Sequence, residues 1–134
     1  MMRKTLIIVL VLIVAIVVLY MIFGGRKPAI VVLPASYDFG EIVQGKGKVS
    51  TDFTVKNIGS APLKFNRVST SCGCTTAEID KTDLAPGAGK RMKVVFDPLV
   101  HIDQFGPIVR VVYLRTNDPE TSELEVAISA KVIK

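Results

Sequence analysis

The chain has 134 residues, 49% of them apolar, which is enough for one ordinary domain with a buried core. Its formal net charge is +5, but four of the 17 Lys and Arg residues flank a single apolar segment. The rest of the chain has 13 Lys and Arg residues against 12 Asp and Glu residues. The remainder is therefore almost neutral. Because it contains no basic stripe with interleaved aromatic residues, the composition argues against a nucleic-acid partner.

The N-terminal apolar segment, Leu6 to Phe23, contains no charged residue, Pro or Gly in its 18 residues. As a helix it would be about 27 Å long, close to the ~30 Å hydrocarbon core of a bilayer. A cleaved secretory signal is the alternative, but its apolar region is usually only about 7 to 15 residues and ends in small residues. No Cys stands directly after the segment to accept a lipid. We therefore predict an uncleaved membrane anchor.

The orientation of this anchor is not decided by charge, because two basic residues precede it and two follow it. A lone apolar segment ahead of the only folded domain is the usual layout of a signal anchor. We therefore expect residues 1–23 to form a short cytoplasmic tail and a single-pass helix, with the domain extracytoplasmic, either periplasmic or on the cell surface. Residues 24–29 form a linker that spans at most about 20 Å.

Residues 30–134 carry β-strand signals throughout, with alternating apolar and polar residues separated by turn sequences and no sustained helical period. The predicted strands are Ile30 to Leu33, Tyr37 to Val43, Val49 to Asn57, Leu63 to Val68, Cys74 to Ile79, Arg91 to Asp97, Ile108 to Thr116 and Leu124 to Val132. Seven or eight strands in this length predict an all-β fold, an antiparallel immunoglobulin-like sandwich. The chain has no Trp and no distant pair of cysteines, so the antibody type of core is not expected.

The strand alternation also predicts which side chains are buried. The residues expected to be almost fully buried between two sheets are Phe53, Val94, Phe96, Val111, Val126 and Ile128. The segment from Ile108 to Thr116 is nearly all apolar, which is typical of a central strand covered on both faces.

Several motifs occur in order along residues 37–134: D-F-G, K-N-x-G-x-x-P-L, S-C-G-C-T, A-P-G and N-D-P. Together they resemble the bacterial DUF1573 family, which is similar to PapD-like, MSP and ciliary ASH/Hydin-type immunoglobulin-like domains. The resemblance implies the same sandwich fold, and PapD-like domains use an edge strand to accept a strand from a partner. It implies no catalytic residue.

Cys72 and Cys74 are the only cysteines and flank Gly73. In a regular strand their Cα atoms would be roughly 6.7 Å apart, near the upper limit for a disulfide. A positive φ at Gly73 would shorten that distance. Four interpretations stay open: a labile disulfide, a two-thiolate Cu(I) site, intermolecular pairing, or two buried hydrophobic side chains. We expect Gly73 to let the chain turn between the sheets, with one thiol buried and one nearer solvent.

His101 and Met92 are the candidate auxiliary ligands of a Cu(I) site. The chain lacks the four ligands of a structural zinc site, and P-G-A-G-K lacks the spacing of a phosphate loop. We therefore expect no enzyme and no small-molecule substrate. The predicted function is a membrane-anchored extracytoplasmic interaction or assembly module that binds a protein through an exposed sheet edge. The alternative is thiol-redox or Cu(I) handling by the Cys-Gly-Cys motif.

Overall fold

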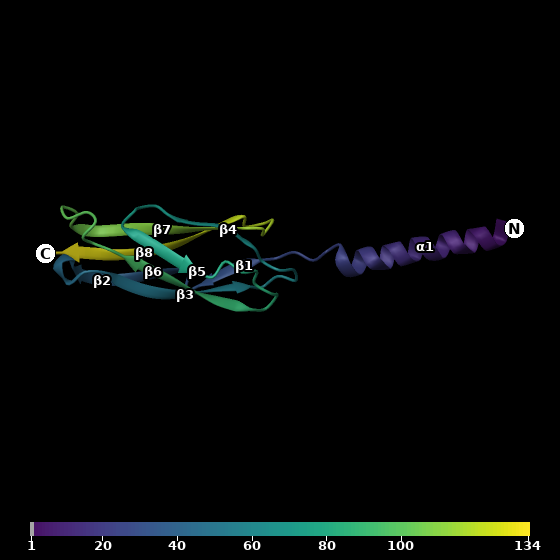
Figure 1. Ribbon diagram of the computed structural model, residues 1–134, viewed down its shortest axis with the longest axis horizontal. Helices are drawn as coiled ribbons and strands as arrows, with labels where there is room; N and C mark the ends of the chain where they lie inside the picture. The colour runs from purple at the N-terminus through teal and green to yellow at the C-terminus, as the bar shows by residue number, and fades with distance from the viewer. Residues whose placement is uncertain (1) are drawn as a thin grey trace.

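The computed structural model describes residues 2–134 and consists of one long helix and one β-sandwich (Figure 1). Helix α1 spans Met2–Phe23. Within it, Arg3–Ile22 has a mean hydropathy of 3.4 and packs against no other part of the described chain. This length and composition fit a membrane-spanning anchor and a signal sequence alike. Met1, the first residue of the predicted tail, lies outside the described residues.

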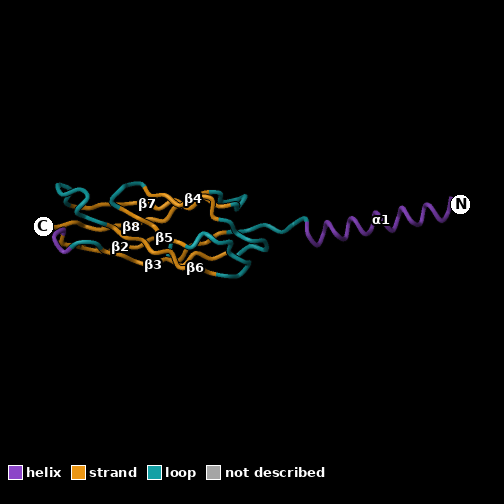
Figure 2. The backbone as a smooth tube through the Cα atoms, in the orientation of Figure 1, coloured by secondary structure: helices purple, strands orange, loops and turns teal. Residues whose placement is uncertain are grey.

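Eight strands follow the helix. They are β1 (Ile30–Leu33), β2 (Ser36–Val43), β3 (Val49–Asn57), β4 (Phe65–Thr70), β5 (Thr75–Ile79), β6 (Gly89–Phe96), β7 (Gly106–Thr116) and β8 (Glu123–Ile133). One sheet has the order β1-β3-β6-β5 and the other β2-β8-β7-β4. The predicted all-β sandwich is therefore confirmed, and each predicted strand overlaps one of these eight. Turns and loops gather at its two ends (Figure 2).

The chain changes sheet at five of the seven connections between consecutive strands. The crossing from β1 to β2 passes through Pro34 and Ala35, and the crossing from β4 to β5 passes through the S-C-G-C segment. As a result, β2 runs parallel to its neighbour β8, whereas every other strand pair is antiparallel. The second sheet is thus mixed, not purely antiparallel as the alternation suggested.

The core lies between the sheets, and five of the six residues predicted there are almost fully buried: Phe53, Val94, Phe96, Val126 and Ile128. The prediction for Val111 is wrong, because this side chain is only partly buried. The inward positions of β7 are taken by Val112 and Leu114, which are fully buried. The outer face of this strand is not covered, since Val109 is 61% exposed. An all-apolar strand shows no alternation, so its sequence does not reveal which face points inward.

The end of the sandwich that receives the linker, here called the linker end, is held together by buried polar side chains. Asn57 is fully buried, and its amide nitrogen donates to the carbonyls of Ala61 and Leu84 at 2.8 and 2.9 Å. Its amide oxygen accepts from the backbone N–H groups of Gly59 and Ala29 at 3.0 and 3.3 Å. One side chain therefore joins a strand end, a turn and the linker.

The linker backbone passes directly over Gly59. A Cβ atom at this position would lie 2.4 Å from the backbone oxygen of Lys27 and 2.4 Å from the nitrogen of Ala29. The Ser60 N–H donates to the same Lys27 oxygen at 2.8 Å. This close approach explains the glycine in the K-N-x-G motif and shows that the last linker residues are bound to the domain.

Asp118 of the N-D-P motif completes the linker end. One carboxylate oxygen accepts from the N–H of Ile30 at 2.9 Å, and the other accepts from Glu120 and Thr121 at 2.8 and 3.1 Å. Burial by itself would raise the pKa of Asp118, but these three backbone donors outweigh it and hold the pKa below its usual value. The first residue of the sandwich is therefore fixed by a buried carboxylate.

Candidate functional site

The S-C-G-C-T-T segment lies toward the opposite end, here called the far end, where β4 crosses to β5. Ser71 extends the pairing of β4 with β7, since its N–H donates to the Val111 carbonyl and its Oγ accepts from the Val111 N–H, both at 2.9 Å. The Thr70 hydroxyl lies 3.0 Å from the Cys72 carbonyl and 2.9 Å from that of Thr75. These bonds fix the connection at both of its ends.

Cys72 and Cys74 form a disulfide, with Cα atoms 5.2 Å apart. The Cα separation is shorter than in a strand because residues 71–74 form a bend and turn. The predicted role of Gly73 is not what achieves this, since its φ is not positive, and a Cβ there would meet nothing within 4 Å. The predicted difference between the two sulfurs is present: Cys74 is 2% exposed, whereas Cys72 is partly exposed.

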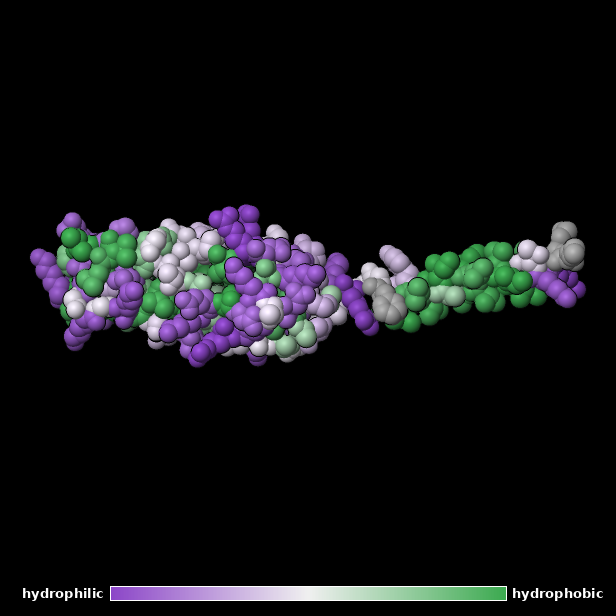
Figure 3. All heavy atoms as spheres, viewed as in Figure 1, coloured by the Kyte–Doolittle hydropathy of each residue, from purple (hydrophilic) through white to green (hydrophobic). Residues whose placement is uncertain are grey.

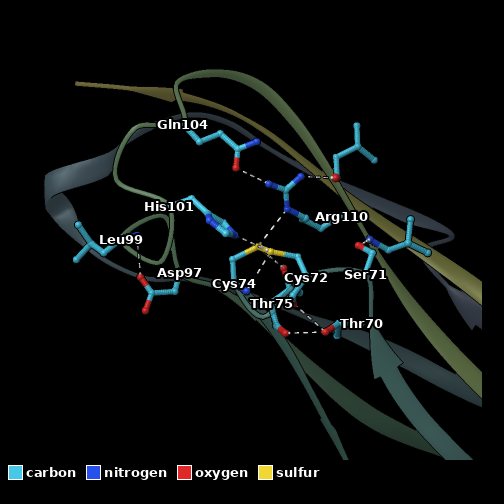
Figure 4. The surroundings of a disulfide bond; sticks show 12 residues. Thr70, Ser71, Cys72, Cys74, Thr75, Asp97, Leu99, His101, Gln104 and Arg110 are labelled. Carbon is cyan, nitrogen blue, oxygen red and sulfur yellow. Dashed lines mark hydrogen bonds between the residues drawn. A yellow bond between two sulfur atoms is a disulfide. The ribbon is translucent and has the colours of Figure 1, made fainter.

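Two cationic or potentially cationic side chains approach the disulfide from separate segments (Figure 4). His101, in the loop before β7, places its Nε2 3.3 Å from the Sγ of Cys72. Arg110, in β7, donates from its Nε to the Sγ of Cys74 at 3.1 Å. Each sulfur therefore has its own nitrogen neighbour.

The guanidinium of Arg110 is oriented by two further acceptors, the carbonyl of Val109 at 2.9 Å and Oε1 of Gln104 at 2.6 Å. Sequence reasoning missed both Arg110 and Gln104. Because side chains alternate between the two faces of β7, Arg110 lies on the same face as the buried residues Ile108 and Val112. It is the one charged residue on this inward face of the strand. That pattern is the signal that would have identified it.

Met92, the other proposed ligand, is not brought to the disulfide. It is fully buried in β6 and pairs with Ile79, four residues beyond the pair formed by Phe96 and Thr75. Four residues along a strand correspond to about 13 Å. Cys72, Cys74 and His101, in contrast, have their ligand atoms within 4.8 Å of one another. In the reduced form, two thiolates and one imidazole at this distance suit a soft ion such as Cu(I).

An open hollow of about 1020 Å³ adjoins the disulfide and is lined by Cys72, His101, Arg110 and the loop before β7. Apolar side chains project around it, since Val100, Ile102, Phe105 and Val109 are between 41% and 63% exposed. Figure 3 shows apolar residues gathered on the helix and again at the far end of the sandwich. The far end therefore presents a disulfide, two nitrogen-bearing side chains and apolar surface together.

The sheet edges differ in how easily they could accept another strand. Strand β1 has only four residues, and the pairings of β2 and β4 each contain a register shift. Such irregularities protect an edge. Strand β5 is the last strand of its sheet and pairs with β6 in unbroken register over all five residues, without Pro. Among the edge strands of the described chain, β5 is the longest whose pairing has no register shift.

Comparison with solved structures confirms the architecture. A protein of unknown function from Porphyromonas gingivalis has a TM-score of 0.70 and 20% identity, over 81% of this chain and 50% of its own. The chain thus spans half the length of that protein. The seventh PapD-like domain of human CEP192 has a TM-score of 0.62 and 11% identity, over 81% of this chain and 87% of its own. The periplasmic chaperone SfaE has a TM-score of 0.57 and 5% identity, over 79% and 60%.

A search of curated proteins found no match. The model of the family described as protein of unknown function (DUF1573) matches residues 31–132, which include the Asn57, Cys72–Cys74 and Asp118 motifs. The sandwich is of the PapD-like, immunoglobulin-like kind, and the chain belongs to the DUF1573 family.

Proposed function

We propose that this protein is a membrane-anchored interaction module whose sandwich stands outside the cytoplasm and binds an extended segment of a protein partner along β5. The observation that carries the proposal is the unbroken register of β5 at the edge of its sheet. Added strands gain affinity from main-chain hydrogen bonds and specificity from pockets for alternate side chains.

The register of β5 identifies the backbone groups that would bind. The Asp97 N–H donates to the Cys74 carbonyl, so Cys74 is a hydrogen-bonded position toward β6. Because hydrogen-bonded and non-hydrogen-bonded positions alternate in an antiparallel pair, Ala77 and Ile79 direct their N–H and C=O groups away from β6. These two residues are therefore the ones that would pair with an incoming strand.

Two features support an anchored domain outside the cytoplasm. Helix α1 contains Arg3–Ile22, long and apolar enough to cross a bilayer, and the Cys72–Cys74 disulfide is the form expected in an oxidising compartment. The bound linker residues hold the linker end of the sandwich toward the membrane and turn the far end away from it. The outer surface of β5 would then face partners in the extracytoplasmic space.

A photoreactive residue at position 78 tests this function in intact cells, because Glu78 is an exposed residue of β5. Position 52 in the centre of the same sheet is the matched control, since Asp52 is also exposed but lies on an interior strand. We expect a specific protein adduct at position 78 and none at 52. Ala77→Pro, which removes an outward N–H, should abolish the adduct without unfolding the domain. Equal adducts at both positions would contradict the proposal.

A second candidate function, thiol-redox or Cu(I) handling, is favoured by the distance of 3.3 Å between Cys72 Sγ and His101 Nε2. Titration of the reduced protein with Cu(I) against a chromogenic chelator distinguishes Cu(I) handling from thiol-redox chemistry. Metal handling predicts one bound ion and weaker binding by His101→Ala, whereas pure thiol chemistry predicts no binding above that of a Cys72→Ser, Cys74→Ser control.

A further inference from the structure

The two sulfurs of the disulfide differ in access, and this difference assigns them separate roles. We propose that Cys72–Cys74 is a directional thiol-exchange site, in which a partner thiol attacks Cys72 and Cys74 leaves as the thiolate. The inference rests on the thiol-redox form of the second candidate function and is independent of strand binding at β5.

Access selects the sulfur that is attacked. Thiol–disulfide exchange requires a thiolate to reach one sulfur along the direction of the bond to the other. Cys72 lines the open hollow, whereas Cys74 is 2% exposed and belongs to the hydrophobic core cluster. An incoming thiol can therefore reach Cys72 from solvent, but Cys74 is covered by protein.

The surroundings of Cys74 favour it as the leaving group. Arg110 donates a hydrogen bond from Nε to its Sγ at 3.1 Å, and the guanidinium is held in place by Val109 and Gln104. A charge-assisted donor of this kind stabilises a thiolate more than a neutral sulfur. Negative charge that develops on Cys74 as the bond breaks is thus met by a positioned positive charge.

The groups around Cys72 suit a sulfur that takes up a proton when it is released as a thiolate. His101 Nε2 lies 3.3 Å away, and the N–H of Cys74 donates to the same sulfur at 3.1 Å. In the first step a partner thiolate forms a mixed disulfide with Cys72 and releases Cys74. In the second, another partner thiol attacks the partner sulfur and releases Cys72. One dithiol becomes a disulfide, and its two protons pass to Cys74 and Cys72, with His101 the nearest carrier for Cys72.

The substrate class is a protein dithiol. Two electrons must come from the partner, and a second thiol tethered nearby resolves the mixed disulfide faster than a free one. The hollow beside Cys72 is open to solvent, so a peptide segment that carries the reacting cysteine can approach it. Reduced glutathione, a soluble monothiol, provides the comparison: it should stop at the mixed disulfide more often than a dithiol peptide does.

The test uses the full chain in detergent micelles, as Cys74→Ser and Cys72→Ser variants treated with oxidised glutathione and followed by intact mass. We expect Cys72 in the first variant to form the adduct at least about tenfold faster than Cys74 in the second. Equal rates, or faster reaction at Cys74, would overturn the direction. In the wild-type protein, acid-trapped mixed disulfides should be found on Cys72 when the peptide containing both cysteines is fragmented, which removes any dependence on how the variants fold.

Arg110→Gln tests the leaving-group role. Reduction of the wild-type disulfide by dithiothreitol should slow about tenfold in this variant, with partial recovery in Arg110→Lys, because lysine restores the charge but not the fixed donor. Arg91→Gln, the same change at a residue exposed on the other sheet, should leave the rate unchanged. An unchanged rate in Arg110→Gln would overturn this role. A disulfide inert in every variant would remove the thiol-redox function itself, whereas exchange at Cys74 would remove only its direction.

Discussion

Polar groups have different roles at the two ends of the sandwich. At the linker end, Asn57 and Asp118 are buried and have several hydrogen-bond partners each, nearly all of them backbone groups. At the far end, Cys72, His101 and Arg110 bond mainly through side chains beside an open hollow. Satisfied buried groups fix one arrangement, whereas accessible sulfur next to cationic side chains favours reaction. The linker end therefore holds the domain in place, and the far end is free to meet other molecules.

The largest effect should come from the core that both ends share. Phe96 is 2% exposed and pairs with Thr75 beside the disulfide. Phe96→Ala should lower the free energy of unfolding by about 4 kcal/mol, because it leaves a cavity the sheets cannot close. Chemical denaturation measures this. A loss of less than about 1 kcal/mol would mean that the far end is loosely packed and that its reactivity reflects disorder.

Asn57→Ala tests the linker end more directly. It should cost about 3 kcal/mol, because two buried carbonyls and two N–H groups lose their partner at once. The neighbouring Lys56→Ala, on the exposed face of the same strand, should change stability by no more than about 0.5 kcal/mol. Similar denaturation midpoints for the two variants would show that the Asn57 network does not hold this end.

Gly59→Ala should cost about 2 kcal/mol, because the new methyl group must displace the linker backbone. Amide hydrogen exchange in residues 58–61 should become faster while the disulfide segment is unaffected. Gly73→Ala is the matched control at the far end, where a Cβ has open space and φ is not positive. Comparable destabilisation by both substitutions would contradict the assignment of crowding to the linker end alone.

Loss of the disulfide should have a smaller effect than either change at the linker end. Because the bond closes a very short loop, the double variant Cys72→Ser, Cys74→Ser should lose about 1.5 kcal/mol. Thermal melting with and without reductant provides the same comparison in the wild-type protein. If the protein unfolded when the disulfide was reduced, the disulfide would be required for stability, which would argue against its use in thiol exchange.

The smallest expected effect is on how stability falls at acidic pH. The pKa of Asp118 is lowered in the folded protein from an ordinary value of 3.8, so its contribution to stability is complete above that pH and is lost as the pH falls below it. Asp118→Asn should therefore flatten the fall in stability below pH 3.8 relative to wild type. Denaturation curves at several acidic pH values measure the slope, and an unchanged slope would contradict the role of the carboxylate charge.

The sequence predicts the sandwich well because alternation and turn residues are local signals. Five of the six predicted core residues follow from these signals. The exception is Val111, which lies in a strand so uniformly apolar that its sequence does not show which face points inward. The parallel pairing of β2 with β8 was not foreseen because it depends on the crossing after Leu33, a long-range property.

The site was predicted only in part. Cys72, Cys74 and His101 meet as candidates, but Met92 lies in the core, and Arg110 comes to Cys74 from 36 residues away. A contact of that separation is set by the register of β7 against β4, which one sequence does not reveal. The glycine between the cysteines was given a conformational role that its φ does not require.

Hydrogen–deuterium exchange of the full chain in lipid nanodiscs, with the disulfide oxidised and then reduced, tests most directly the claim that the two ends are independent. Reduction should speed exchange only in residues 70–76, 97–106 and 109–111, because these segments contact the disulfide or the connection that carries it. Residues 57–61 and 117–121 should keep their protection in both states. Faster exchange at the linker end on reduction would show that the ends are coupled and contradict the account.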